Sequence, residues 1–509
     1  MEKQWLGLLF TALLFGAANW ANDLAKPKGP EEDGTKPALT RIAGEGIYDS
    51  RAFTYLTELS DEIGARVTGS PQDQRAEDWG LAKMKSIGLS NIHTEKWSLW
   101  KGWMRGTATA EMLAPMQRKI AVDAMGWTGS TPAAGAEAEV VTANLFNLDE
   151  EIKNIARFRG KIAMMKPEGM PKQNFWLIFA RYGDFLRELQ KAGAVAVIGG
   201  EGGFKGEGMH LTHTGILGFA QDFAIPVVDM PMEDQGQLER FLAAGKTVRL
   251  RLNVQNYFTG GPVETANVVG EIPGREHPEE VLVVGAHLDS WDLGEGTTDN
   301  GVGASSALGA ADAIMKSGQR PSRTIRFVLF TGEEQGLLGS LAYAKQHAEE
   351  MKNHLGCVVL DEGQGPIKEI QLGGHYDLVP AMEAFADSLE NLHEVKVSDK
   401  PEFGSDTGPF ILAGLPGIYL YQDSPDYKYT HHSAADALEA VKPDVLTQNA
   451  TIMALTAFWL ADRPEHFAMP WPPERTARML REKGEYDFLK AFDLWPFGDL
   501  GQAPTTPSN

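Results

Sequence analysis

The chain has 509 residues, too many for one ordinary hydrophobic core, so we expect two or more structural units. Hydrophobic residues make up 43% of the sequence and charged residues 23%, which excludes a disordered or fibrous protein. The formal net charge is −22, and such an acidic surface repels phosphate backbones and anionic lipids. We therefore predict no nucleic-acid or membrane-surface partner, while noting that solubility alone is a sufficient explanation of the acidity.

The first residues have the pattern of an export signal. Lys3 is followed by an apolar run over Trp5–Phe15 and then by small residues up to Ala18. The run is shorter than the ~20 residues that a membrane span needs and fits a secretory signal peptide over residues 1–18. Cleavage after Ala21 and an uncleaved anchor are the alternatives. We expect a secreted or periplasmic protein, with the Pro/Lys/Glu/Gly-rich segment 19–37 as a linker or short propeptide.

Segment 38–121 begins with helical periodicity and ends in two extended stretches. In segment 122–256, short strand-like runs alternate with Gly- and Pro-rich turns around one clear helix, Asp184–Ala192. This alternation of short strands, turns and a helix predicts a compact α+β module with its own core. His210 and His213 in this module could form a metal pair, but we favour their interpretation as polar loop histidines.

Between Thr265 and Trp459, apolar strands alternate with amphipathic helices. The expected strands are 281–286, 325–330, 357–360 and 417–421, and the expected helices are 303–315, 337–347, 378–388 and 444–460. This alternation predicts an α/β sandwich around a largely parallel sheet. We expect one discontinuous domain over 38–121 and 257–465. The Pro- and aromatic-rich tail, 466–509, is expected to wrap the surface or to pair subunits in a homodimer.

Cys357 is the only cysteine, so no intrachain disulfide can form. It lies in an apolar run, and we expect it to be a small core residue without a catalytic role.

Histidines and acids follow the carboxyl ends of all four predicted strands. They are His287 with Asp289, Glu333 with Glu334, Asp361 with Glu362, and His431 with His432. Any one pair would be explained as solvated loop residues. Ligands of open α/β sheets bind beyond the carboxyl ends of the strands, so four pairs at one sheet edge predict a metal site.

Imidazole and carboxylate ligands suit zinc. Asp299, in a Gly-containing turn before a helix, adds a carboxylate that can bridge two ions about 3.5–4 Å apart. Successive side chains near a strand end diverge, so one of Glu333 and Glu334 is expected to be a ligand and the other the general base. Asp289 is placed to orient the imidazole of His287.

Five motifs carry a likeness to a known family. They are His287-Leu288-Asp289-Ser290, Thr298-Asp299-Asn300-Gly301, Thr331-Gly332-Glu333-Glu334-Gln335-Gly336, Asp361 and His431-His432-Ser433. They resemble the motifs of co-catalytic zinc exopeptidases, a family that includes zinc aminopeptidases, glutamate carboxypeptidases and the transferrin receptor. The resemblance runs from about Ala38 to Trp459 and includes Gly64–Ser70. It implies a three-layer α/β/α sandwich around a mostly parallel mixed sheet, with 122–256 as an inserted protease-associated domain.

The resemblance also implies two zinc ions per chain and a role for each site residue. It makes His287, Asp299, Glu334, Asp361 and His432 the ligands, with Asp299 bridging. It makes Glu333 the general base and Asp289 the orienting acid. Ser405 and Asp406 resemble the family's substrate-side Ser-Asp motif.

Three positions bear on this assignment of ligands. His432 is preferred to His431 because the family's ligand directly precedes a Ser or Thr. Asn300 stands where many relatives have a second Asp or a Pro. Glu362 follows Asp361 directly, so either of the two acids is a candidate ligand.

The implied activity is that of a metallo-exopeptidase, which hydrolyses dipeptides or short peptides with a hydroxide activated by two zinc ions. A non-catalytic receptor-like scaffold and a glutaminyl cyclase with a single zinc are the alternatives. The complete ligand set and the intact Glu333 disfavour the scaffold, and the two-metal set disfavours the cyclase.

The peptide end that is recognised depends on charge near the site. A carboxypeptidase needs a cation for the terminal carboxylate. The four arginines near strand starts are expected to lie away from the site; they are Arg275, Arg320, Arg323 and Arg326. Five acids are expected at the pocket mouth instead, namely Asp292, Glu295, Asp406, Asp423 and Asp426. They favour an aminopeptidase or dipeptidase that binds a terminal ammonium. A carboxypeptidase is the alternative, with Arg66 as a candidate clamp.

Overall fold

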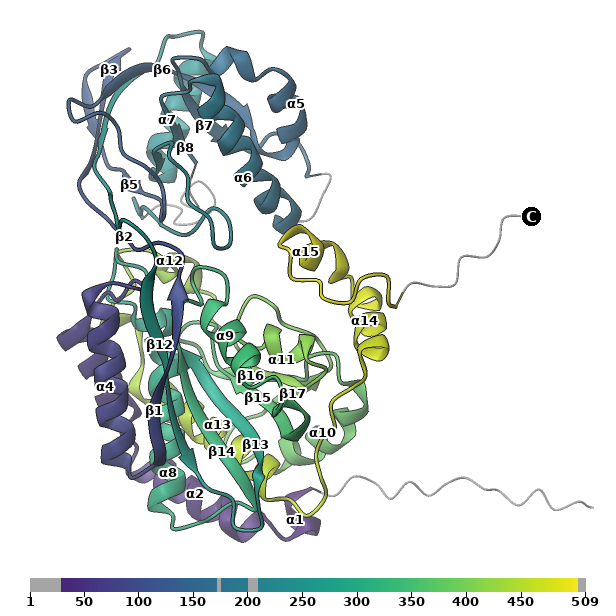
Figure 1. The fold of residues 1–509 in the computed structure, drawn as a ribbon. Coiled ribbons are helices and arrows are strands. Elements are labelled where there is room, and N and C mark those ends of the chain that lie inside the picture. The colour runs from purple at the N-terminus through teal and green to yellow at the C-terminus, as the bar shows by residue number, and fades with distance from the viewer. Residues whose placement is uncertain (1–28, 172–174, 200–208, 502–509) are drawn as a thin grey trace, which may run out of the picture.

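The computed structural model describes residues 29–171, 175–199 and 209–501 (Figure 1). The expected signal peptide and residues 19–28 of the expected linker lie outside these ranges. Within them the chain has a mixed α/β fold with two eight-stranded sheets, one in the lower and one in the upper part of Figure 1. Across the described ranges, no helix combines the length and the apolar character needed to cross a membrane.

The first sheet has the strand order β1-β12-β14-β13-β15-β18-β16-β17. In that order the strands are Ser90–Leu99, Val263–Ile272, Arg323–Phe330, His277–His287, His354–Val359, Gly417–Gln422, Ile367–Gln371 and Lys396–Ser398. The four central strands β14, β13, β15 and β18 are parallel, so their carboxyl ends meet at one edge. The flanking strands β12 and β16 run antiparallel to this group, which makes the sheet mixed.

Helices cover both faces of the first sheet. Leu282 and Val284 of β13 pack in one core with α8 (Val302–Lys316) and α13 (Pro443–Asp462). Val281 and Val283 point to the opposite face, into a core that includes Tyr343 of α9 (Leu338–Gln346). Because successive side chains of a strand alternate between faces, a strand buried on both sides has a continuous apolar sequence.

The remaining helices around this sheet are α2 (Lys36–Tyr48), α3 (Ala52–Thr57), α4 (Pro71–Ile87), α10 (Val379–Ser388), α11 (Gly408–Leu412) and α12 (Tyr427–Thr430). Cys357 of β15 is fully buried in the core, as expected.

The second sheet has the order β4-β3-β10-β6-β7-β8-β9-β5. In that order its strands are Arg118–Ile120, Ala108–Ala114, Arg249–Val254, Ala136–Asn144, Ile162–Lys166, Ala196–Ile198, Val227–Asp229 and Asp123–Ala124. The helices α5 (Leu148–Lys153), α6 (Phe175–Ala192) and α7 (Met232–Ala243) accompany it, and the unit has its own hydrophobic cores. The short strands β2 (Trp103–Met104) and β11 (Tyr257–Phe258) pair where the chain leaves and re-enters the first unit.

The C-terminal segment forms α14 (Pro473–Glu482) and α15 (Tyr486–Ala491). Its apolar side chains share a core with Phe403 and Ile411 of the first unit. Helix α15 also contacts α6 of the second unit, so the segment joins the two units at the right of Figure 1. The described part of the tail therefore wraps its own chain.

Three sequence-based expectations need correction. Helix α1 (Pro30–Asp33) and the start of α2 occupy the described part of the expected linker. The strands β3 and β4 pair into the second sheet, so 108–120 belongs to the second unit rather than to the first. In its described residues the second unit has α5 and α7 besides the expected helix; α7 was hidden by its mostly polar sequence and its internal Gly236.

Candidate metal centre

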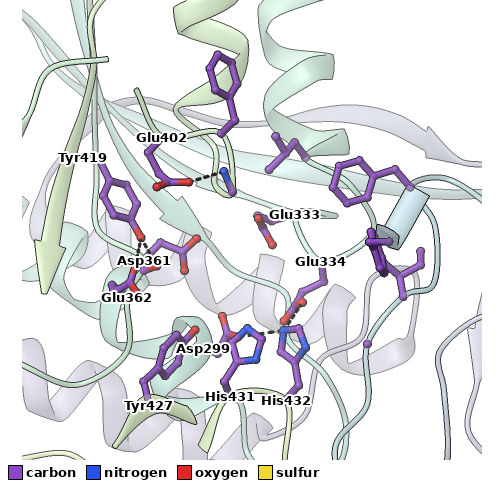
Figure 2. Close-up of a pocket in the computed structure, with 17 residues that line it drawn as sticks. Asp299, Glu333, Glu334, Asp361, Glu362, Glu402, Tyr419, Tyr427, His431 and His432 are labelled. Carbon is purple, nitrogen blue, oxygen red and sulfur yellow. Dashed lines mark hydrogen bonds and ion pairs between the residues drawn. The ribbon is translucent and has the colours of Figure 1, made fainter. Parts of the chain in front are cut away.

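The predicted ligands meet at the carboxyl edge of the first sheet. His287 ends β13, Asp361 follows β15, and Glu334 follows β14. Asp299 lies in the turn before α8, and His432 lies in the loop after α12. Figure 2 shows Asp299, Glu334, Asp361 and His432 around one cavity.

The five side chains form two sets that share Asp299. In one set, Nε2 of His287 lies 3.2 Å from an oxygen of Asp299 and 3.2 Å from an oxygen of Asp361. In the other, Nε2 of His432 lies 3.2 Å from the second oxygen of Asp299 and 3.0 Å from Oε2 of Glu334. Each carboxylate oxygen of Asp299 thus belongs to a different set, which is the arrangement of a bridging ligand.

Both histidines are oriented through their Nδ1 atoms. Nδ1 of His287 lies 2.9 Å from the backbone carbonyl oxygen of Asp289, and Nδ1 of His432 lies 3.2 Å from that of Thr214. A carbonyl oxygen can only accept, so each Nδ1–H donates, and Nε2 faces the shared carboxylates. This is the tautomer and orientation that metal-ligating histidines adopt.

Thr214 belongs to the second unit, which therefore helps to shape the site. Its N–H donates to the carbonyl of His432, N···O 2.9 Å. His432 has a φ of +59°, in the left-handed region that a non-glycine residue seldom adopts. The two contacts with Thr214 hold His432 in this conformation.

Asp289 connects His287 to Glu333. One carboxylate oxygen of Asp289 accepts from the hydroxyl of Thr68 at 2.7 Å, and the other accepts from the backbone N–H of Glu333 at 3.3 Å. The carboxylate also lies 3.6 Å from Nδ1 of His287, farther than the backbone carbonyl of the same residue. Asp289 thus contacts the imidazole most closely through its backbone carbonyl.

Geometry separates the two adjacent pairs that the sequence left open. His431 lies 3.8 Å from Asp299, farther than His432 does. Asp361 approaches His287, whereas Glu362 accepts a hydrogen bond from the hydroxyl of Tyr419 at 2.9 Å. His432 and Asp361 are therefore the better-placed ligands.

Burial and the two histidines act in opposite directions on the pKa values of the acids. Burial raises the pKa of Glu333 well above its usual range and that of Glu334 to about 7. Burial also acts on Asp299, but hydrogen bonds from His287 and His432 hold its pKa well below the usual range. Carboxylates crowded into a buried place favour a bound cation.

The chemistry of the donor set fits zinc. Each set offers one imidazole nitrogen, one terminal carboxylate and one oxygen of the shared Asp299, which leaves an open position at each ion for water or substrate. Oε1 of Glu334 is buried without a hydrogen-bond partner, as expected of an oxygen that faces a cation.

The ligand sets open into a cavity of about 300 Å³. One side is acidic, and Figure 2 labels Glu333, Glu362 and Glu402 there, with Tyr419 and Tyr427. The apolar part of the lining consists of Phe179, Ile216, Phe219, Leu337 and Phe403. Sequence reasoning missed Glu402, both tyrosines and the residues from the second unit. For Glu402 a signal existed, since it lies three residues before Ser405 of the Ser-Asp motif.

The residues expected to bind substrate are placed differently. Ser405 and Asp406 are fully buried, and neither lines the cavity. None of the other expected mouth acids lines it either. Asp292, for example, is held by the guanidinium of Arg105, with N···O contacts of 2.6–3.0 Å. Glu402 lines the cavity, whereas Asp406 is buried in the core. The direction of each side chain depends on the fold of the loop, which a short sequence motif does not predict.

The arginines lie away from the cavity. Arg66 is fully buried and donates to the backbone carbonyls of Glu295 and Gly296 at 2.9 and 2.7 Å, so it supports the loop behind the site. Arg275, Arg323 and Arg326 form ion pairs with Asp462, Glu280 and Glu271, as expected of residues at strand starts. Neither His210 nor His213 joins a cluster of potential metal ligands in the described ranges.

Comparison with known proteins gives the same family from sequence and structure. The model of "Peptidase family M28" matches residues 267–457, the segment that contains all five predicted ligands. The peptidase M28 precursor of Shewanella amazonensis has a similar structure, with a TM-score of 0.75 at 28% identity over 86% of this chain and 99% of that one. A zinc aminopeptidase of Bacillus subtilis shares the fold, with a TM-score of 0.62 at 21% identity over 83% of this chain and 97% of that one.

Among curated proteins, carboxypeptidase Q of Mus musculus is 31% identical over 430 residues, 84% of this chain and 89% of the mouse protein. Carboxypeptidase Q of Homo sapiens is 30% identical over 432 residues, with the same shares. Both relatives are matched over nearly their full length, which covers both units and not only the metal centre. The chain is therefore a peptide hydrolase that belongs to peptidase family M28.

Proposed function

We propose that the protein is an exopeptidase that binds two zinc ions and removes single residues from dipeptides or short peptides with a free amino terminus. The observation that carries this proposal is the pair of ligand sets that share Asp299 at the floor of the cavity. His287, Asp361 and one oxygen of Asp299 would hold one ion, and His432, Glu334 and the other oxygen would hold the second.

When bound, two zinc ions would polarise the scissile carbonyl and lower the pKa of a water molecule. The chain supplies the proton transfers. Glu333 is half-buried, lines the cavity and is not part of either ligand set. Its carboxylate accepts the proton of the attacking water and returns it to the leaving amine. Asp289 holds the backbone of Glu333 and thereby fixes the position of the base.

The charge of the cavity supports recognition of an ammonium group. No lysine or arginine occurs among the described residues that line it, whereas Glu362 and Glu402 lie there beyond the ligand sets. These two acids, rather than the mouth acids expected from the sequence, are suited to pair with a terminal ammonium. The alternative is release of C-terminal residues, which the relatives named carboxypeptidase Q favour.

Three further properties belong to this proposal. We assign the second unit as a protease-associated domain, because it is inserted between β1 and β12 of the first sheet. The signal-like pattern of residues 1–18 is our reason for proposing a secreted or periplasmic location. The sequence also suggested that the tail pairs subunits in a homodimer. The described tail packs on its own chain, and sedimentation of the full chain tests whether it also forms a dimer.

A dipeptide panel with metal analysis tests the proposal. We expect the zinc-loaded protein to cleave dipeptides with a free amine and to cleave their N-acetylated forms several-fold to many-fold less well, since acetylation removes the charge that pairs with the acids. Peptides with amidated carboxyl termini should remain substrates. Efficient release of a C-terminal residue from blocked peptides, with amidated peptides resisting, would establish the carboxypeptidase alternative. No cleavage in any form would favour the scaffold.

A further inference from the structure

The apolar side of the cavity contains three phenylalanine rings from three distant segments. Phe179 comes from α6 of the second unit, Phe219 from the loop between β8 and β9, and Phe403 from the loop before α11. The rings of Phe179 and Phe219 touch edge to face, with centroids 6.4 Å apart. Phe403 belongs to the core of the first unit and the tail. The apolar side is thus shared between two separately folded units.

The C-terminal segment connects these rings. Phe492, which directly follows α15, stacks on Phe179 at 5.8 Å and lies against Phe219 at 4.5 Å between ring centroids. Phe488 of α15 lies 5.1 Å from Phe492 and 6.3 Å from Phe403. Helix α15 and its C-terminal cap residue, Phe492, therefore contact all three cavity rings.

The helix is itself fixed to the first unit. Phe488 and Leu489 are buried in the core that contains Phe403, Trp471 and Leu480. Phe492 is only partly buried and stands at the edge of this core, against the second unit. Its ring can therefore be removed while the anchor of the helix is kept.

We propose that α15 sets the apolar side of the substrate cavity, with Phe492 as the positioning residue for Phe219 and Phe179. The rings line the same cavity as the acids and the ligand sets, so the side chain of a bound peptide can contact them. Removing a large apolar side chain from water favours binding in proportion to its area. Loss of the Phe492 ring leaves a gap behind Phe219 and lets it withdraw, because packed groups relax into a void. The inference rests on the proposed function and names its substrates: peptides whose amino-terminal residue is large and apolar.

The test compares Ala-Ala, Leu-Ala and Phe-Ala as substrates of the zinc-loaded full chain. We expect Phe492→Ala to raise KM for Leu-Ala and Phe-Ala about tenfold, the usual effect of altered apolar contacts in a pocket. kcat for all three and KM for Ala-Ala should stay within about twofold, because uniform binding is what changes.

Two variants serve as controls. Phe492→Tyr keeps the ring and should behave like the wild type. Tyr486→Ala removes another ring of the same helix, which contacts Trp495 at 4.9 Å rather than a cavity ring, and should also leave the substrate preference unchanged. Two results would overturn the proposal: an equal rise in KM for all three dipeptides in Phe492→Ala, or a rise in KM for Leu-Ala and Phe-Ala alone in Tyr486→Ala.

A binding measurement separates this inference from the proposed function. If the wild type cleaves none of the dipeptides, the proposed function fails, and calorimetry with L-phenylalanine and L-alanine then tests the cavity alone. The wild type should bind phenylalanine more tightly than alanine, and Phe492→Ala should lose this difference. A wild type without the difference, or a variant that keeps it, overturns the inference.

Discussion

The two adjacent glutamates at the end of β14 differ in what surrounds their side chains. Glu334 pairs with His432 at 3.0 Å, whereas the backbone of Glu333 is held by Asp289 and its side chain lines the cavity. We expect Glu333→Gln to keep its fold and metal but to lose roughly 10²–10⁴-fold in kcat, because the amide preserves the shape and cannot accept a proton. Metal content and steady-state kinetics on one preparation measure this.

Glu334→Gln is the matched control for that variant. Because Glu334 belongs to a ligand set, its substitution should lower zinc content as well as turnover. A folded, zinc-loaded Glu333→Gln protein with near-normal turnover would assign the base elsewhere, with Asp289 or Glu362 as the next candidates.

Asn300, the residue that departs from the family pattern, links two elements behind Asp299. Its side-chain nitrogen donates to the carbonyl of Leu360 at 2.9 Å, and its oxygen accepts from the N–H of Gly303 in the first turn of α8 at 2.8 Å. Asn300→Ala removes both bonds at a fully buried position and should reduce the free energy of unfolding by roughly 2–4 kcal/mol.

Urea unfolding of the zinc-loaded protein measures this loss. Asn300→Asp keeps the acceptor for Gly303 and loses the donor to Leu360, so it separates the two bonds. An Asn300→Ala protein as stable as the wild type would show that neither bond contributes.

At the scale of elements, the central strands were predictable from the sequence and their neighbours were not. The expected strand 325–330 lies within β14, and 417–421 lies within β18, because strands buried on both faces are continuous apolar runs. The site followed from these strands, since residues after parallel strands share one edge. The antiparallel strands β12 and β16 were missed because their pairing depends on partners far along the chain.

The parts of the site that depend on distant segments of the chain were also not predictable from local sequence. The five proposed ligands follow strands or a turn, so local sequence was sufficient to select them as candidates. The carbonyl of Thr214 on His432 and the phenylalanines of the second unit reach the cavity only through tertiary packing, so no local pattern marks them.

The C-terminal segment is anchored by a buried histidine. His375 packs on Trp471 with ring centroids 4.0 Å apart and is almost fully buried. Burial lowers the pKa of His375 to about 4 from its ordinary value of 6.5. The unfolded chain therefore binds a proton at a higher pH than the folded chain. The stability that follows is fully present above pH 6.5 and is lost as the pH falls toward 4.

We expect this histidine to contribute at most roughly 3 kcal/mol to the pH dependence of unfolding. His375→Phe keeps a ring against Trp471 and removes the titration, so its stability should fall less steeply than that of the wild type in this pH range. The free energy of unfolding, measured in urea across the range, checks the prediction. Parallel curves for the two proteins would contradict it.

At the scale of the whole molecule, the site depends on three parts of the chain. The first sheet delivers the ligands, the second unit holds His432 through Thr214, and the C-terminal segment packs behind the apolar side of the cavity. A change at the metal centre should therefore affect the stability of the complete chain and not only of one loop.

The last prediction concerns metal removal. Three buried carboxylates and two histidines, linked by four histidine–carboxylate contacts of 3.0–3.2 Å, form a site that a cation stabilises. We expect about two zinc ions per chain, and loss of activity with a chelator that Zn, Co or Mn restores.

Since a ligand that binds only the folded state stabilises it by about 4 kcal/mol at 1,000 times its Kd, chelation should also lower Tm for both units together. Elemental analysis, kinetics and calorimetry of one preparation before chelation, after it and after reloading measure all three effects. Full activity in thoroughly metal-free protein would rule out the metal-dependent mechanism. A single ion per chain would leave one of the two ligand sets without its proposed role, and the variants Asp361→Asn and Glu334→Gln would show which set holds that ion.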